Sequence, residues 1–346
     1  MSLARYRSGA PVSQRLIFAT LLLVAQAITL ATGTVTTPAA AAERPTIYVS
    51  DASVTLGTKV TVSGASPQVL QWVVLQVLTP ENGWQEVARR LTSVSRNFSF
   101  RAPGWYGTHQ LRIYAATTLL APATVSDVRT VTVKTAYKPK GKRSDWRWIS
   151  HRGARWDPCE TITYQVNPVG GYSQSTADIR TALRKVGQVT GFRFEYKGST
   201  DGTVRRGEPG THPPEADLLV DWQSPRQDFE LAGRVAGIGG HWVQHGRRFD
   251  GYVVLDRSHR LKRAIWRQTM THEIGHVLGL GHARSPHQVM YGGAAPANPR
   301  WGAGDLAGLR RIGASRGCLD RPESTLRPEL AQSVSLRAGR PGARHR

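Results

Sequence analysis

The most informative stretch of the sequence is THEIGHVLGLGH, which runs from Thr271 to His282. His272 and His276 are four residues apart, so a helix would place both imidazoles on one face, one turn apart. Gly279 can end that helix in a left-handed conformation, because glycine has no Cβ to clash. The chain can then turn sharply and bring in His282. The spacing predicts one zinc ion held by three histidines, with its fourth position left to water.

Glu273 directly follows the first of these histidines. Its carboxylate could reach a zinc-bound water without binding the metal, which suits a general base. The alternatives are a helix with incidental histidines and a zinc site without activity. A purely structural site has no need of such a base, so we favour a catalytic Zn²⁺ site.

The stretch HEIGHVLGLGH resembles the extended zinc motif of the metzincin metalloendopeptidases. Metzincins also place a methionine in a tight turn beneath the zinc, and Met290 in HQVMYGG is similar to it in position. The short interval to a Met-Tyr pair resembles the matrixin branch, of the bacterial secreted type. Weaker similarity in RWDPCETITYQV, ADLLVDW and WGAGDLAGLRRIG extends the resemblance over about residues 148–318.

The resemblance implies an α+β catalytic domain with a mixed sheet and a zinc-binding active-site helix. It also implies a zinc metalloendopeptidase, which hydrolyses protein or peptide substrates with a zinc-activated water and Glu273 as general base. Met290 would support the site structurally. Gly237–Val243 (GIGGHWV) resembles the edge strand on which metzincins lay the substrate as an added strand.

The chain departs from the vertebrate matrixins in several ways. We find no propeptide with a zinc-blocking cysteine, and Tyr291 precedes Gly292 rather than the usual proline. The dense His/Asp pattern that holds a second, structural Zn²⁺ and Ca²⁺ is also missing, so the sequence leaves these metals open. Candidate ligands for a second site, with surface residues as the default interpretation, are His212, His241, His245, Asp217, Asp221 and Asp228.

The N-terminus has the layout of a secretory signal peptide, residues 1–42. Positive charges at Arg5, Arg7 and Arg15 precede the apolar run Leu16–Thr32, and small residues follow at Ala39–Ala42. A membrane anchor is the alternative, since this run is at the short end for a spanning helix. No later segment is long and apolar enough to span a bilayer. We therefore expect a secreted, extracellular protein without a membrane span in the mature chain.

The two cysteines, Cys159 and Cys318, are expected to form a disulfide in an oxidising compartment. The bond would tie the two ends of the catalytic domain together. The alternative is that Cys159 is a free thiol that blocks the zinc in a latent form.

The rest of the chain predicts a multi-domain layout. Short alternating strands separated by turn residues predict an immunoglobulin-like β-sandwich over residues 44–133. A basic linker, 134–147, is expected to be solvated, and the tail, 319–346, to be disordered. Within the second domain we expect helices over Ser175–Val189, with Ser175 as N-cap, over Arg260–Leu278 and over Asp305–Gly313.

Composition narrows the classes of partner. The 346 residues carry 46 Lys+Arg against 24 Asp+Glu, a formal net charge of +22. A strongly basic chain favours anionic surroundings, such as an anionic cell-wall polymer or extracellular surface. No nucleic-acid-binding motif is recognisable, and we expect no nucleic-acid partner. The alternative to an enzyme is a cell-wall or matrix-binding protein in which the zinc domain is incidental.

Overall fold

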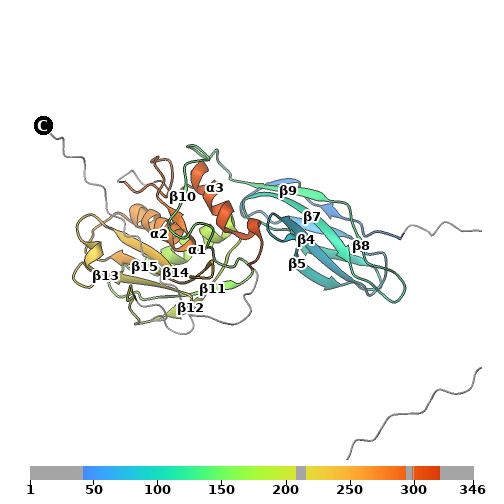
Figure 1. Ribbon diagram of the computed structural model, residues 1–346, viewed down its shortest axis with the longest axis horizontal. Coiled ribbons are helices and arrows are strands. Elements are labelled where there is room, and N and C mark those ends of the chain that lie inside the picture. Colours follow the sequence, from blue (N-terminus) through green and yellow to red (C-terminus); the bar gives the residue numbers. More distant parts are fainter. Residues whose placement is uncertain (1–41, 208–215, 294–297, 299, 320–346) are drawn as a thin grey trace, which may run out of the picture. The chain divides into compact units, whose positions relative to one another are not determined.

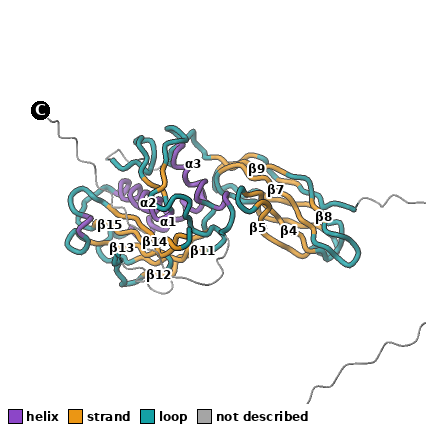
Figure 2. The backbone as a smooth tube through the Cα atoms, in the orientation of Figure 1, coloured by secondary structure: helices purple, strands orange, loops and turns teal. Residues whose placement is uncertain are grey.

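The computed structural model describes residues 42–207, 216–293, 298 and 300–319 (Figures 1 and 2). The predicted signal peptide and tail lie outside the described residues, apart from Ala42 and Leu319. The described residues from Ala42 onward form one compact unit. Among the described helices, none has the length and apolar character needed to cross a membrane.

The N-terminal part consists of two sheets around a core of their own. The smaller sheet contains, in order, β1 (Tyr48–Val49), β3 (Thr61–Ala65) and β6 (Asn97–Arg101). The larger sheet contains, in order, β2 (Ser53–Thr55), β9 (Arg129–Lys134), β7 (Gly107–Ala115), β4 (Trp72–Thr79) and β5 (Gly83–Leu91), with β8 (Thr124–Val125) paired to β7. Alternate residues of β4 and β7 point into the core, where Leu75 and Ile113 are fully buried. These strands account for the alternating sequence pattern.

The second part is built on a mixed five-stranded sheet, as the resemblance implied. Its strands, in order, are β12 (Arg193–Ser199), β11 (Thr161–Val166), β13 (Leu218–Gln223), β15 (Arg247–Asp256) and β14 (Gly237–Gln244). Only the edge strand β14 is antiparallel to its neighbour. The strand predicted over Gly237–Val243 therefore lies at the sheet edge.

Two long helices, α1 (Ser175–Thr190) and α2 (Arg263–Leu278), pack on one face of this sheet (Figure 1). Their apolar side chains share a core with strand residues such as Leu218 and Val253. A smaller cluster around Leu219, Ile238 and Val254 covers the other face. The remaining elements are α3 (Ala303–Ile312), the short strands β10 (Arg147–Trp148) and β16 (Leu280–Gly281), and single 3₁₀ turns at Phe229–Leu231 and Ala314–Arg316.

The helix boundaries differ from the predicted ones in three places. Ser175 is the first helical residue and is buried, and Gln174 is the N-cap, so the predicted Ser175 cap is wrong. Helix α2 starts at Arg263 because Lys262 is still extended, with a ψ of 143°. Helix α3 starts before Asp305, whose carboxylate accepts a hydrogen bond from the backbone N–H of Gly302 at 2.8 Å. At α1, the tertiary packing that buries Ser175 sets the helix start. At α3, the contact between the Asp305 carboxylate and the Gly302 N–H sets it.

The predicted linker, residues 134–147, is mostly exposed, as expected, but hydrogen bonds anchor it to the second part of the chain. The Tyr137 hydroxyl donates to the Trp301 carbonyl at 3.1 Å, and the Lys140 carbonyl accepts from the Ala303 N–H at 2.8 Å. The Asp145 carboxylate accepts from the backbone N–H groups of Arg284 and Ser285, at 2.8 and 3.0 Å. Backbone groups and a tyrosine therefore tie this segment to α3 and to the loop after β16.

The turn between β4 and β5 contacts the end of the second part. Glu81, in this turn, pairs with both Arg155 and Arg316. The Arg155 side chain is only 3% exposed, so the carboxylate compensates a buried cation. The N–H of Cys318 donates to the Gln85 side chain at 3.1 Å. One end of the N-terminal sheets is thus covered by the second part of the chain.

Candidate metal centre

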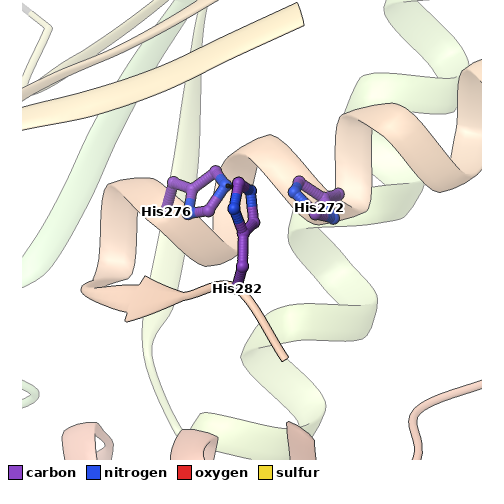
Figure 3. Close-up of side chains that lie close together, drawn as sticks. All are labelled: His272, His276 and His282. Carbon is purple, nitrogen blue, oxygen red and sulfur yellow. Dashed lines mark hydrogen bonds between the residues drawn. The ribbon is translucent and has the colours of Figure 1, made fainter. Parts of the chain in front are cut away.

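The structure brings His272, His276 and His282 together on the C-terminal half of α2 and the segment that follows it (Figure 3). One ring nitrogen of each lies within 4.8 Å of those of the other two. The Nε2 atoms of His276 and His282 are 3.2 Å apart. The two helical histidines are one turn apart, and their rings face the third, as the spacing predicted.

The outer ring nitrogens of the two helical histidines are held by backbone carbonyls. His272 Nδ1 lies 2.7 Å from the Val289 carbonyl oxygen, and His276 Nδ1 lies 2.6 Å from that of Leu280. A carbonyl only accepts, so each Nδ1 carries the proton and donates it. This tautomer leaves Nε2 with a free lone pair, which is the arrangement that metal-binding histidines use.

The donor set fits a zinc ion. Burial lowers the pKa of His272 to about 4 and that of His276 well below its ordinary value, and it also lowers the pKa of His282. All three imidazoles are therefore neutral near pH 7, as ligation requires. Buried His272 Nε2 has no hydrogen-bond partner among the described residues. A buried nitrogen lone pair without a partner is costly, and a metal ion would satisfy it. Three neutral nitrogen donors are the ligand set of a catalytic zinc site.

A glycine turn delivers the third histidine. Gly279 has a φ of 113°, in the left-handed region, and its N–H caps α2 by donating to the carbonyls of Gly275 and His276. The next two residues, Leu280 and Gly281, pair with β10 as strand β16. This pairing fixes the direction in which the chain leaves the helix and so places His282.

Glu273, which follows His272 on α2, is buried, at 1% exposure. Burial raises its pKa to about 8, against a smaller opposing effect of a hydrogen bond to the Gly239 backbone. Glycines on β14 allow this close packing: a Cβ on Gly239 would collide with the Glu273 carbonyl, and one on Gly237 would come within 3.0 Å of its Cγ. One carboxylate oxygen, Oε2, has no partner among the described residues.

Met290 lies directly beneath the helix, with 1% of its surface exposed. A Cβ on Gly275 would collide with the Met290 sulfur, so the glycine makes room for the thioether between the two helical histidines. The Met290 carbonyl also accepts from the Ala283 N–H at 2.8 Å, next to His282. The methionine therefore contacts the segments that carry all three ligands.

Comparison with known families agrees with this geometry. The family model described as Matrixin, Peptidase_M10, matches residues 155–300. This stretch of the chain is matrixin-like. The match spans the three histidines, Glu273 and Met290, and it supports a metallopeptidase with a catalytic zinc and with protein or peptide substrates. A search of curated proteins found no match to the chain.

Two residues support the matrixin-like site in roles that the sequence did not predict: Arg248, and His241, which was a candidate ligand of a second metal. His241, on β14, is buried, and its Nδ1 donates to the His276 carbonyl at 3.1 Å. Arg248, on β15, is completely buried and donates to the carbonyls of Ala154 and Ser150, at 2.8 and 2.9 Å. A Cβ on Gly279 would come within 2.7 Å of the Arg248 Nε, so this guanidinium packs under the turn. An arginine between Arg247 and Phe249 carries no sequence signal for such a position.

The candidate ligands of a second metal have other partners. Asp228 forms an ion pair with Arg206, Asp221 accepts hydrogen bonds from backbone N–H groups, and Asp217 accepts from Thr163. His245 is exposed, and His212 lies outside the described residues. Among the described residues, the structure does not bring these side chains together into a metal-binding cluster.

Cys159 and Cys318 form a disulfide, with 5.3 Å between their Cα atoms. The bond joins the start of β11 to the segment after α3. Both cysteines of the chain are thereby used. A disulfide-bonded Cys159 cannot act as a zinc-blocking thiol, so the structure favours the predicted bridge over that alternative.

Proposed function

We propose that the protein is a secreted zinc-dependent metalloendopeptidase in which Glu273 is the general base. The observation that carries the proposal is the convergence of three neutral histidines, each helical one with its Nδ1 bound to a carbonyl, on a helix whose residue after His272 is the buried Glu273. A structural zinc site would not need the carboxylate. The matrixin match over residues 155–300 supports the same conclusion.

His272, His276 and His282 would hold the zinc ion. When bound, the ion would act as a Lewis acid on the scissile carbonyl and lower the pKa of a water toward about 7. Glu273 would take the proton from that water and pass it to the amine that leaves. Burial raises the pKa of the Glu273 carboxyl, which would help it to hold the proton between the two transfers.

The edge strand β14 is the proposed docking site for the substrate backbone. Among the described strands it pairs with β15 alone, so its other edge has backbone groups that an extended peptide could bind as an added strand. Because β14 also packs against Glu273 through Gly237 and Gly239, a peptide on this edge would lie close to the base.

The test is digestion of casein by the purified protein with and without a chelator. We expect cleavage that the chelator abolishes and that added zinc restores. Glu273→Ala should keep zinc but lose activity by ~10²–10⁴-fold, because the ligands remain while the base is gone. Glu195→Ala, which removes an exposed carboxylate of the same domain, is the matched control and should stay active.

Two results would contradict the proposal. An unchanged rate in Glu273→Ala would exclude the general base. Retention on cell envelopes without any cleavage would instead favour the cell-wall or matrix-binding protein.

A further inference from the structure

Large apolar side chains gather at one end of the N-terminal sheets. Among the described residues, Leu119 is 104% exposed, Leu120 87% and Val94 80%. Such exposure of leucine and valine differs from that of an ordinary surface residue, which keeps part of its side chain against its neighbours. We define the apolar tip as the exposed residues Val69, Leu70, Trp72, Leu91, Val94, Leu119 and Leu120.

The apolar tip is formed by three loops that hydrogen bonds join to one another. The buried Gln71 side chain accepts from the Ser66 hydroxyl at 2.5 Å and donates to the Ala116 carbonyl at 2.6 Å. The Gln71 carbonyl accepts from the Thr92 N–H at 3.0 Å. The loops around residues 66–71, 92–96 and 116–121 therefore lie side by side, at the free ends of β4, β5 and β7.

The most exposed residues sit on a closed turn. The Thr118 N–H donates to the Ala121 carbonyl at 2.9 Å, and the Thr118 hydroxyl accepts from the N–H groups of Leu120 and Ala121. Figures 1 and 2 show the loop between β7 and β8 projecting from this end of the sheets. The backbone is thus internally satisfied, while the two leucine side chains are left in solvent.

The opposite end of the same sheets, at Glu81 and Gln85, is covered by the second part of the chain. The described chain also begins at the apolar tip: the Glu43 carbonyl accepts from Thr124, and its carboxylate lies 3.6 Å from Arg96. The apolar run Leu16–Thr32 precedes this point in the sequence. In both interpretations of that run, as a signal peptide or as an anchor, it is a segment directed to a membrane. The residues that follow it most closely in the described chain lie at the apolar tip.

We propose that the apolar tip inserts into the surface of an anionic lipid bilayer. Protruding loop leucines suit insertion between lipid headgroups, where apolar side chains become buried about 5–10 Å deep. Trp72 is of the side-chain type that prefers the membrane–water interface. Protein-binding sites, in contrast, usually offer a packed patch with complementary shape.

The charge of the molecule favours anionic lipids over neutral ones. Arg44, Arg89 and Arg96, with side chains 57%, 64% and 45% exposed, flank the tip, although exposed carboxylates pair with them. The net charge of +22, of which Arg5, Arg7 and Arg15 of the predicted signal peptide supply three, adds long-range attraction to a negative surface. Apolar insertion would hold the tip, and charge would raise the rate and affinity of binding.

The test is co-flotation of the chain from Ala42 onward, whose described residues form one compact unit, with vesicles of phosphatidylglycerol and phosphatidylcholine. Omitting residues 1–41 removes the apolar run as a second source of binding. We expect binding that is stronger than to pure phosphatidylcholine and that weakens as salt is added. Replacing both tip leucines, Leu119→Ser with Leu120→Ser, should lower the affinity for vesicles about tenfold or more.

Val169→Ser is the matched control, because Val169 is 62% exposed but lies outside the tip. It should bind vesicles as the parent does. Glu273→Ala should also bind unchanged, so the outcome does not depend on the proposed peptidase activity. An unchanged melting temperature in the double variant would show that it is folded.

Three outcomes would overturn the proposal. One is the absence of vesicle binding by the parent. Another is equal binding by the parent and the double leucine variant, which would reduce the interaction to charge alone. The third is a concentration-dependent dimer that the double variant abolishes, which would assign the tip to a second copy of the chain.

Discussion

The carboxylate of Asp305 accepts a hydrogen bond from the backbone N–H of Met290, with 3.1 Å between Oδ1 and N. Its other oxygen accepts from the Val289 N–H at 2.6 Å. The Val289 carbonyl in turn accepts from His272 Nδ1. A completely buried carboxylate on α3 thus positions both the methionine turn and, through Val289, the first proposed zinc ligand.

Asp305→Asn should therefore loosen the site without removing any ligand. The amide nitrogen cannot accept, so at least one backbone N–H would face another donor. Hydrogen bonds to charged groups contribute about 1.5–3 kcal/mol each, and we expect the free energy of unfolding to fall by about 2 kcal/mol or more. Urea unfolding with and without zinc measures this, with Asp51→Asn, at an exposed aspartate, as control. Equal stability of the two variants would show that Asp305 has no supporting role.

Gly275→Ala should be harmful although it replaces a glycine inside a helix. In an open helix this change stabilises by about 0.8–1.0 kcal/mol. Here the new Cβ would collide with the Met290 sulfur, so we expect lower stability and lower zinc affinity. A stabilised Gly275→Ala protein with normal zinc content would disprove the close contact.

Met290→Leu should keep most activity, since volume-conserving exchanges usually cost under about 1.5 kcal/mol.

Removing the disulfide should destabilise the protein while leaving the zinc ligands in place. Cys159 and Cys318 are 159 residues apart in the sequence. The chain-entropy relation gives a loop of this size roughly 5 kcal/mol, although strain and residual structure often reduce the value. We expect a lower melting temperature for Cys159→Ser. Higher basal activity at unchanged stability would instead support an inhibitory thiol.

His109 should make the protein sensitive to acid. Burial lowers its pKa to about 4, and its Nε2 donates to the Trp105 carbonyl at 2.8 Å. The unfolded chain, with a histidine pKa near 6.5, binds a proton more readily, so acid favours unfolding. The contribution is complete above about pH 6.5 and is lost as pH falls toward about 4, with an upper limit of about 3 kcal/mol.

The measurement is urea unfolding of the parent and of His109→Gln between pH 7.5 and pH 4.5. The zinc-site histidines are the same in both proteins, so their effect cancels in the difference. The parent should lose more stability than the variant over this range. Parallel pH profiles would show that His109 does not titrate on unfolding.

His282→Ala should lower both zinc content and activity, because it removes a ligand rather than a base. Glu273→Ala, in contrast, should lower activity alone. Metal analysis of the two purified variants after dialysis separates the roles. Stoichiometric zinc with near-normal turnover in His282→Ala would mean that His282 is only a neighbour of the site.

The convergence of the three histidines could be predicted from the sequence because the pattern that indicates it is local. A spacing of four residues places His272 and His276 on one helix face whatever surrounds them. The left-handed turn at Gly279 could likewise be predicted, because glycine has no Cβ to clash in that conformation, and the structure has that turn. The alternating strands of the N-terminal part were predictable for the same reason, since a period of two is a property of each strand alone.

Other features depend on contacts between distant segments, and only the tertiary structure decided them. Ser175 does not have its expected capping role, and the basic segment 134–147, although mostly exposed as expected, is tied by a hydrogen bond to the start of α3. The support of the site by Asp305, and the burial of Arg248 under Gly279, join residues that no local pattern connects. The apolar tip forms because the loops at the ends of three strands lie side by side. Each of its leucines, taken alone, gives no sign in the sequence of such a cluster. Periodicity and turn chemistry act within a few residues, whereas these contacts depend on how the folded chain packs.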